Sequence, residues 1–264
     1  MWRTWIAAGF ACLAALCLGC GGSKAGGVIV VGSTSVQPMA EMLAQEFDRQ
    51  NPDAHVEVQG GGSTAGIQAL ANGIADIGMC SRSLKPNETG FTPITIARDG
   101  LVVVVHLTNR VNGLSRQQVR EVFEGKVRNW REVGGDDREI TLVTREEGSG
   151  TREAFEHLVM GKARIARTAL TQESNGTVRE LVKHDPGAVG YMSLGLVHGE
   201  VKALRIDGVA PTAEEVIAGR YPLVRPFLFL VKGAPCEAAE KFIEYVLSPP
   251  AQAMLEEEGL VRVK

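Results

Sequence analysis

From residue 28 onward, short apolar segments alternate with segments whose apolar positions recur every three or four residues. Residues 28–31 are all Val or Ile, and Val36, Leu43 and Phe47 follow at helical spacing. A β-branched run predicts a strand, and a period near 3.6 predicts an amphipathic helix. We therefore predict strands at 28–31, 56–58, 75–79, 101–105, 140–143, 187–191 and 225–231, and helices at 36–47, 67–71, 117–123, 151–160, 236–247 and 250–257. This order predicts an α/β fold with a largely parallel sheet.

Neither a long linker nor a repeat of fixed period divides this pattern. The chain is long enough for two lobes of ordinary domain size. We expect it to cross between them twice, so that residues 28–104 and 223–264 form lobe 1 and residues 105–222 form lobe 2. Two crossings would join the lobes as a hinged pair.

The first residues have the features of an export signal. Arg3 precedes an apolar run at 5–18, which is shorter than the about 20 residues that a spanning helix needs. We predict a signal peptide at 1–19, a lipidated Cys20 and a linker at 20–27. Two alternatives are a secretory signal cleaved near Gly19 and a short membrane-associated helix that is not cleaved. Each places the protein outside the cytoplasm, in the periplasm or at the cell surface.

Charge and cysteine content narrow the possible partners. The formal net charge is −3, which disfavours a generic binder of nucleic acid or other polyanions. An anion would therefore need a local, organised site. Beyond Cys20, the remaining cysteines are Cys80 and Cys236. We expect two free, buried thiols, and the alternative is one disulfide.

Three predicted junctions between a strand and a helix share one chemical form. They are Gly32-Ser33-Thr34-Ser35, Gly62-Ser63-Thr64 and Gly148-Ser149-Gly150-Thr151. A helix N-terminus has unpaired N–H groups and partial positive charge, and Ser or Thr hydroxyls add further donors. Because such junctions lie at the carboxyl ends of strands, three of them can face one cleft. Each junction alone has a simpler explanation as a helix cap or a tight turn.

Arg145 precedes the third junction by a few residues. Its planar guanidinium is suited to bind two oxygens of a tetrahedral anion. We expect Glu147 to orient this side chain. The alternative is a surface ion pair of Arg145 with Glu146 or Glu147.

Seven motifs extend these observations along nearly the whole chain. They are Gly32-Ser-Thr-Ser-Val-Gln-Pro38, Gln59-Gly-Gly-Gly-Ser-Thr-Ala-Gly66, Ala75-Asp-Ile-Gly-Met-Cys-Ser-Arg82, Asn129-Trp-Arg-Glu-Val-Gly-Gly135, Arg145-Glu-Glu-Gly-Ser-Gly-Thr151, Tyr221-Pro-Leu-Val-Arg-Pro-Phe227 and Leu247-Ser-Pro-Pro-Ala-Gln252. Together they resemble the phosphate-binding component of bacterial phosphate ABC transporters. The resemblance implies the type II periplasmic-binding-protein fold, in which two α/β lobes close on a ligand cleft.

The resemblance also implies a function and a site. The function is capture of inorganic phosphate between the lobes and delivery to the membrane permease of an ABC importer, by a monomeric, lipid-anchored protein without a cofactor or metal. The implied phosphate contacts are Ser33, Thr34, Ser35, Ser63, Ser81, Arg145, Ser149, Gly150 and Thr151, and the segment Ser174-Asn175-Gly176 is a weaker candidate.

Ser81 departs from one form of the family. The enterobacterial form has an Asp at this position, which accepts the proton of phosphate and rejects sulfate, since sulfate has no proton to donate. A serine can either accept or donate. Beside it, Arg82 is expected either to add positive charge or to be solvated.

Other functions have weaker support in the sequence. The glycines at 60–62 match only loosely a dinucleotide fingerprint. Ser149 is not in a G-x-S-x-G elbow, and the five histidines lack metal-ligand spacing. We therefore expect a protein that is not an enzyme. Two alternatives stay open: a receptor for another tetrahedral oxyanion such as sulfate or molybdate, and a secreted phosphoesterase.

Overall fold

The computed structural model describes residues 27–263. The predicted signal peptide at 1–19, Cys20 and nearly all of the linker lie outside the described residues. Within residues 27–263, no helix combines the length and apolar character that crossing a bilayer requires.

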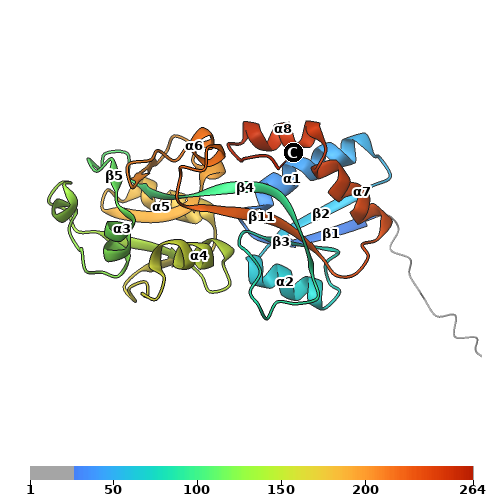
Figure 1. Cartoon of the computed structure of the whole chain (residues 1–264), viewed down its shortest axis with the longest axis horizontal. Coiled ribbons are helices and arrows are strands. Elements are labelled where there is room, and N and C mark those ends of the chain that lie inside the picture. Colours follow the sequence, from blue (N-terminus) through green and yellow to red (C-terminus); the bar gives the residue numbers. More distant parts are fainter. Residues whose placement is uncertain (1–26, 264) are drawn as a thin grey trace, which may run out of the picture.

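Two lobes lie side by side, and the long strands β4 and β11 pass between them (Figure 1). The strands are β1 (Gly27–Gly32), β2 (His55–Gly60), β3 (Ile77–Cys80), β4 (Thr92–Val105), β5 (Gly113–Leu114), β6 (Thr141–Arg145), β7 (Leu170–Gln172), β8 (Ala188–Ser193), β9 (Lys202–Ala203), β10 (Arg205–Ile206) and β11 (Val224–Val231). The helices are α1 (Gln37–Gln50), α2 (Ser63–Ala71), α3 (Arg116–Phe123), η1 (Trp130–Val133), α4 (Gly150–Phe155), η2 (Glu156–Met160), α5 (Asn175–His184), η3 (Leu194–Leu196), α6 (Ala213–Ile217), α7 (Glu237–Val246) and α8 (Pro249–Glu257).

One sheet of nine strands runs through both lobes in the order β2-β1-β3-β11-β4-β8-β6-β7, with β9 beside β4. The outer pairs β1–β2, β1–β3, β6–β7 and β6–β8 are parallel. The crossing strands β4 and β11 are antiparallel to each other and to their neighbours β8 and β3. The expected largely parallel sheet is therefore parallel at its two ends and antiparallel in the middle.

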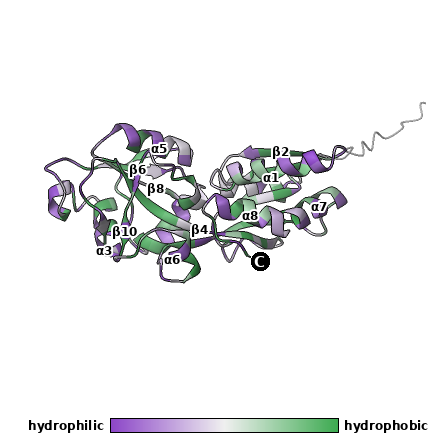
Figure 2. Ribbon diagram, turned by 90° about the horizontal axis from the view of Figure 1, so that it is seen from above, coloured by the Kyte–Doolittle hydropathy of each residue, from purple (hydrophilic) through white to green (hydrophobic). Residues whose placement is uncertain are grey.

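Strand β4 passes from the first lobe to the second. Its residues 92–100 pair with β11, and its residues 101–105 pair with β8. Residues 101–105 are fully buried and read as hydrophobic in Figure 2. The placement of the lobe boundaries at residues 104 and 223 stays a prediction.

Helices cover both faces of the sheet in the first lobe. On one face α1 packs with α7, and the rings of Phe47 and Phe242 meet edge to face at 5.3 Å. On the other face α2 buries Ile67 and Leu70 against Leu228 and Leu230 of β11. Because helices cover both faces of the sheet here, β1 and β3 consist almost entirely of apolar residues and glycine.

In the second lobe, stacked aromatic rings pack beside β6. The rings of Phe155 and Tyr191 lie parallel with centroids 4.0 Å apart, and Phe123 packs on Phe155 at 4.6 Å. Burial raises the pKa of Tyr191 to about 12. Its hydroxyl bonds Thr144 at 2.7 Å and accepts from the backbone N of Arg145 at 3.3 Å. The end of β6, and with it Arg145, is thereby held in place.

Every strand and helix that the pattern predicts is present, with shifted ends. The predicted strand at 101–105 is only the second half of β4, since Pro93, Arg98 and Asp99 interrupt the apolar pattern of the first half. The predicted helix at 151–160 is α4 followed by a π-helical turn, η2. Helix α5 was not predicted.

The expectation for the cysteines is half right. Cys80 and Cys236 are both free, and burial raises the pKa of the Cys80 thiol. Cys236 is exposed rather than buried. It occupies the N-cap position of the surface helix α7, where its side chain lies outside the apolar face of the helix.

Gly32 lies opposite Met79 of β3, in close contact with its backbone. Its φ is +148°, and a Cβ there would lie 2.2 Å from the carbonyl O of Met79. Gly32→Ala is therefore expected to lower the free energy of unfolding by about 2–3 kcal/mol, measured by urea denaturation. Gly73→Ala is the matched control, because Gly73 also has positive φ but nothing within 4 Å of the added atom. Equal losses in the two variants would show that the close approach to Met79 is unimportant.

Candidate oxyanion-binding site

Four loops meet at the carboxyl ends of strands from both lobes. In the first lobe, β1 lies in parallel between β2 and β3, so the segments after Gly32, Gly60 and Cys80 emerge at one edge. The N–H of Gly62 donates to the carbonyl of Gly32 at 2.9 Å, which ties two of these loops together. From the second lobe, the loop after β6 reaches the same edge. The three Ser/Thr-Gly junctions therefore converge as predicted.

Serine hydroxyls from the first lobe form a buried cluster. Ser33 Oγ donates to Ser81 Oγ at 2.8 Å, and the backbone N of Ser81 donates to Ser63 Oγ at 3.1 Å. All three side chains are buried. These hydroxyls supply rotatable donors and acceptors without a fixed charge.

The second lobe meets this cluster through the start of α4. Thr151 Oγ1 lies 2.7 Å from Ser35 Oγ, and the N–H of Thr64 donates to the carbonyl of Gly148 at 3.1 Å. A Cβ on Gly150 would lie 2.1 Å from Ser63 Oγ and 2.7 Å from Ser81 Oγ. Only glycine permits this approach of the two lobes.

Ser149 is the N-cap of α4. Its Oγ accepts from the backbone N of Arg152 at 3.3 Å, and its side chain is buried. Ser149 therefore caps this helix, and its contact with phosphate stays a prediction.

Arg145 lies at the centre of these loops and is only 1% exposed. Its Nε and Nη2 donate to the two carboxylate oxygens of Glu146 at 2.9 and 2.8 Å. Nη2 also donates to Thr34 Oγ1 of the other lobe at 3.0 Å. Nη1 is buried and has no hydrogen-bond partner among the described residues. A buried charged donor without a partner is costly, so this atom is suited to an anionic ligand.

Two expectations about Arg145 are corrected. Glu146 holds the guanidinium, whereas Glu147 is exposed. The backbone N of Glu146 donates to the carbonyl of Gln172 in β7, and this contact keeps Glu146 beside Arg145. The ion pair is not a surface pair, because Arg145 is buried.

Arg82 has a different role from both expected ones. It is 5% exposed and is neither solvated nor available to an anion. It pairs with Glu88 at 2.7 Å in its own lobe and with Glu153 of α4 at 2.9 Å in the other lobe. Lys85 also reaches Glu153 at 2.6 Å. The carboxylate of Glu153 thus joins two cations across the boundary between the lobes.

Behind Ser35 lies a second buried group that the sequence did not reveal. Its members are Asn175, Asp99, Ser193 and Arg225, and all four side chains are buried. Asn175 was only a weak candidate, and the others were not candidates at all. The signal in the sequence was small: Arg225 is the one charge in β11, and Asp99 follows Arg98 just before the apolar half of β4.

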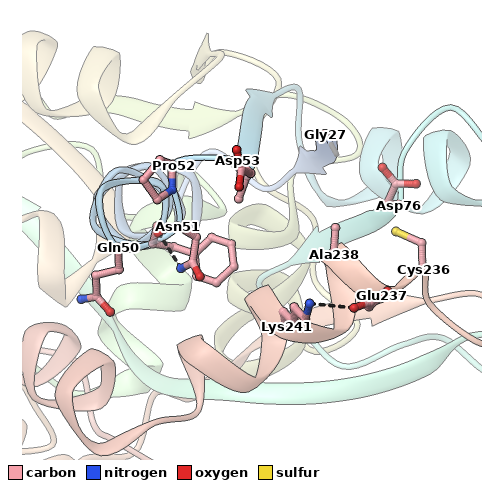
Figure 3. A pocket seen from close by; sticks show the side chains of 12 residues that line it. Gly27, Gln50, Asn51, Pro52, Asp53, Asp76, Cys236, Glu237, Ala238 and Lys241 are labelled. Carbon is pink, nitrogen blue, oxygen red and sulfur yellow. Dashed lines mark hydrogen bonds and ion pairs between the residues drawn. The ribbon is translucent and has the colours of Figure 1, made fainter. Parts of the chain in front are cut away.

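A hollow of about 750 Å³ lies elsewhere, at the far end of the first lobe (Figure 3). Its lining includes Asp53, Asp76 and Glu237, and its Lys241 is paired with Glu237 at 2.7 Å. Acidic side chains outnumber the cation there, so this hollow does not suit an anion. Within residues 27–263, no group of three or more His, Cys, Asp or Glu side chains is arranged to hold a metal ion.

Comparisons with known proteins agree with this arrangement. The family model of the PBP superfamily domain matches residues 21–250. The phosphate-binding protein PstS of Bacillus subtilis is 33% identical over 250 residues, which cover 92% of this chain and 83% of that protein. A crystal structure of a phosphate ABC transporter substrate-binding protein from Clostridium perfringens, with bound phosphate, aligns with a TM-score of 0.88 and 38% identity, over 90% of this chain and 100% of that one.

A second structure, of an ABC-type phosphate transport receptor from Vibrio cholerae, aligns with a TM-score of 0.75 and 40% identity, over 89% of this chain and 99% of that one. The fold is therefore that of the type II periplasmic binding proteins, with a mixed α/β sheet and flanking helices. The chain belongs to the PBP superfamily and, within it, to the family of the phosphate-binding components of bacterial phosphate ABC transporters.

Proposed function

We propose that this protein captures inorganic phosphate between its two lobes and delivers it to the membrane permease of an ABC importer. The observation that carries the proposal is the buried guanidinium of Arg145. Its Nη1 has no partner among the described residues, and its Nη2 donates to the Thr34 hydroxyl of the opposite lobe. A doubly charged, tetrahedral anion of small size matches this set of donors.

The proposed phosphate contacts come from both sides. Arg145 supplies the charge, and hydroxyl and backbone N–H groups supply the other donors. They are Ser33, Thr34, Ser35, Ser63 and Ser81 from the first lobe and Ser149, Gly150 and Thr151 from the second. An anion contacts donors of both lobes only when the lobes are together, so binding of the anion favours the closed arrangement.

The protein is proposed to act outside the cytoplasm as a monomer, anchored to the membrane by lipid on Cys20 after removal of residues 1–19. The lobes are proposed to divide at residues 104 and 223. It is proposed not to be an enzyme. A phosphoesterase needs a nucleophile with an adjacent base, and among the described residues the side chain of Ser149 bonds Arg152 N and no histidine.

Titration calorimetry with phosphate, sulfate and molybdate tests the proposal. Glu146 and Asp99, two carboxylates close to the proposed contacts, are each paired with an arginine. A phosphate proton therefore has only hydroxyl acceptors such as Ser81. We expect phosphate to bind with a Kd near micromolar, about −8 kcal/mol, and to bind more tightly than sulfate. Tighter binding of sulfate would overturn the phosphate assignment, and turnover of an aryl phosphate that is lost in Ser149→Ala would favour the phosphoesterase.

Glu153→Gln is expected to weaken phosphate binding about 3- to 10-fold, mainly through faster dissociation. The carboxylate links Arg82 and Lys85 across the lobes but makes no proposed contact with phosphate, so its loss destabilises only the closed form. Stopped-flow release of phosphate measures the change. Glu156→Gln is the matched control, because Glu156 pairs with Arg152 inside the second lobe. Equal release rates in the wild-type protein and in both variants would contradict this role of Glu153.

A further inference from the structure

The hydroxyl of Ser35 has three polar neighbours and only one proton. Asn175 Nδ2 donates to Ser35 Oγ at 2.8 Å, and Arg225 Nη2 donates to it at 3.3 Å. Thr151 Oγ1 lies 2.7 Å away. A hydroxyl oxygen has two lone pairs. Because both are taken by these donors, the Ser35 proton is left to donate, and Thr151 Oγ1 accepts it here.

Asn175 cannot turn its amide around without losing a contact. Its Oδ1 accepts from the backbone N of Ser193 at 3.2 Å, and that atom is always a donor. The Nδ2 group must therefore face Ser35. The side chain of Asn175 is 1% exposed, so water does not replace either contact.

Contacts with Asp99 fix the position of the Arg225 side chain. Its Nε donates to Asp99 Oδ2 at 2.9 Å, and Asp99 Oδ1 accepts from Ser193 Oγ at 2.7 Å. Burial raises the pKa of Asp99, and the adjacent guanidinium of Arg225 opposes that shift. The guanidinium also donates to the carbonyl of Ser81 at 3.4 Å, and it lies 5.3 Å from the centre of the Phe227 ring.

These contacts form a closed ring through Ser35, Arg225, Asp99, Ser193 and Asn175. Asp99 and Arg225 are directly opposite each other on the crossing strands β4 and β11. Asn175 and Ser193 belong to α5 and β8 of the second lobe, and Ser35 belongs to the loop after β1 of the first. The ring is therefore complete only when both lobes are together.

We propose that Asn175 and Arg225 are specificity-determining positioning residues, which fix Ser35 Oγ as an obligate donor to an unprotonated oxygen of the bound oxyanion. This inference rests on the proposed function. It assigns an orientation to the ligand: the oxygen at Ser35 carries no proton, and the proton of hydrogen phosphate is directed to the cluster of Ser33, Ser63 and Ser81. A protonated or esterified oxygen at Ser35 leaves the hydroxyl without a good acceptor.

A double-mutant cycle between Asn175→Ala and Ser35→Ala tests the inference, with phosphate affinity measured by calorimetry on the purified protein. Ser35→Ala is expected to weaken binding about 10- to 100-fold, because a hydrogen bond to a charged group is lost. Asn175→Ala is expected to weaken it about 5- to 10-fold when Ser35 is present and less than 2-fold when Ser35 is already Ala. A merely structural role of Asn175 would not depend on the Ser35 hydroxyl.

Arg225→Lys gives a second cycle in case Asn175→Ala does not fold. Lysine keeps the charge beside Asp99 but lacks the planar fork that reaches Ser35. It is expected to show the same dependence on Ser35, and thermal unfolding verifies that each variant is folded. Asn72→Ala, at the exposed end of α2, is the control and is expected to leave affinity unchanged.

The outcomes separate this inference from the proposed function. Losses that simply add in both cycles would overturn the role of the ring while phosphate binding by the wild-type protein stands. An absence of phosphate binding by the wild-type protein would overturn the proposed function and this inference with it.

Discussion

Replacement of Arg145 by Met is expected to weaken phosphate binding roughly 1000-fold, about 4 kcal/mol. Arg145 is the buried cation whose Nη1 has no partner among the described residues, and its other nitrogens are fixed by Glu146 and by Thr34 of the opposite lobe. Methionine keeps much of the side-chain volume but removes every donor. The charge of Glu146 would then face the anion without compensation. Titration calorimetry at constant salt measures the loss.

Arg131→Met is the matched control for Arg145→Met. The Arg131 side chain is 65% exposed and pairs with Asp137 at the surface of the second lobe. This variant is expected to bind phosphate as the wild-type protein does. An Arg145→Met protein that stays folded and binds phosphate within 3-fold of the wild-type affinity would show that the anion is held elsewhere.

Gly150→Ala is expected to weaken phosphate binding by more than 100-fold, about 3 kcal/mol, with little loss of stability. Gly150 begins α4, where alanine is intrinsically more favourable than glycine. The added Cβ, however, would lie 2.1 Å from Ser63 Oγ in the other lobe. The methyl group therefore prevents the two lobes from approaching each other but does not disturb either lobe alone.

Two measurements separate these effects. Calorimetry gives the affinity, and small-angle X-ray scattering shows whether phosphate still makes the Gly150→Ala protein more compact. The expected result is a folded protein whose radius of gyration does not change with phosphate. Ligand-dependent compaction equal to that of the wild-type protein would contradict the close approach at Gly150.

The Ser/Thr-Gly junctions were predictable because their information is local. A glycine followed by hydroxyl side chains, placed between an apolar run and a helical period, specifies a turn at the end of a strand. Parallel pairing of β1 with β2 and β3 then brings such turns to one edge. Arg145 was found for the same reason, since it ends β6 next to the third junction.

The ring behind Ser35 was not predictable because its contacts join distant parts of the chain. Arg225 and Asp99 are 126 residues apart, and Asn175 and Ser35 are 140 apart. Pro226 and Arg225 make the start of β11 read as a sheet edge, although the strand lies between β3 and β4. Only the strand register reveals that these charges face each other.

The sequence also could not show which of Glu146 and Glu147 would pair with Arg145. Both follow Arg145 directly, and the sequence pattern gives no reason to prefer one. The choice depends on the backbone contact of Glu146 with Gln172 in the neighbouring strand β7. Helix α5 was not predicted because its capping box lacks the usual sequence signal. The box pairs Ser174 with Thr177 rather than with Glu or Gln.

A crystal structure of this protein grown with phosphate tests the central claim most directly. The expected result is a phosphate ion with one oxygen within hydrogen-bond distance of Arg145 Nη1, with further oxygens at Ser35, Ser63 and Thr151. A phosphate ion bound away from Arg145, or an Nη1 paired with a protein group while phosphate is bound, would contradict it.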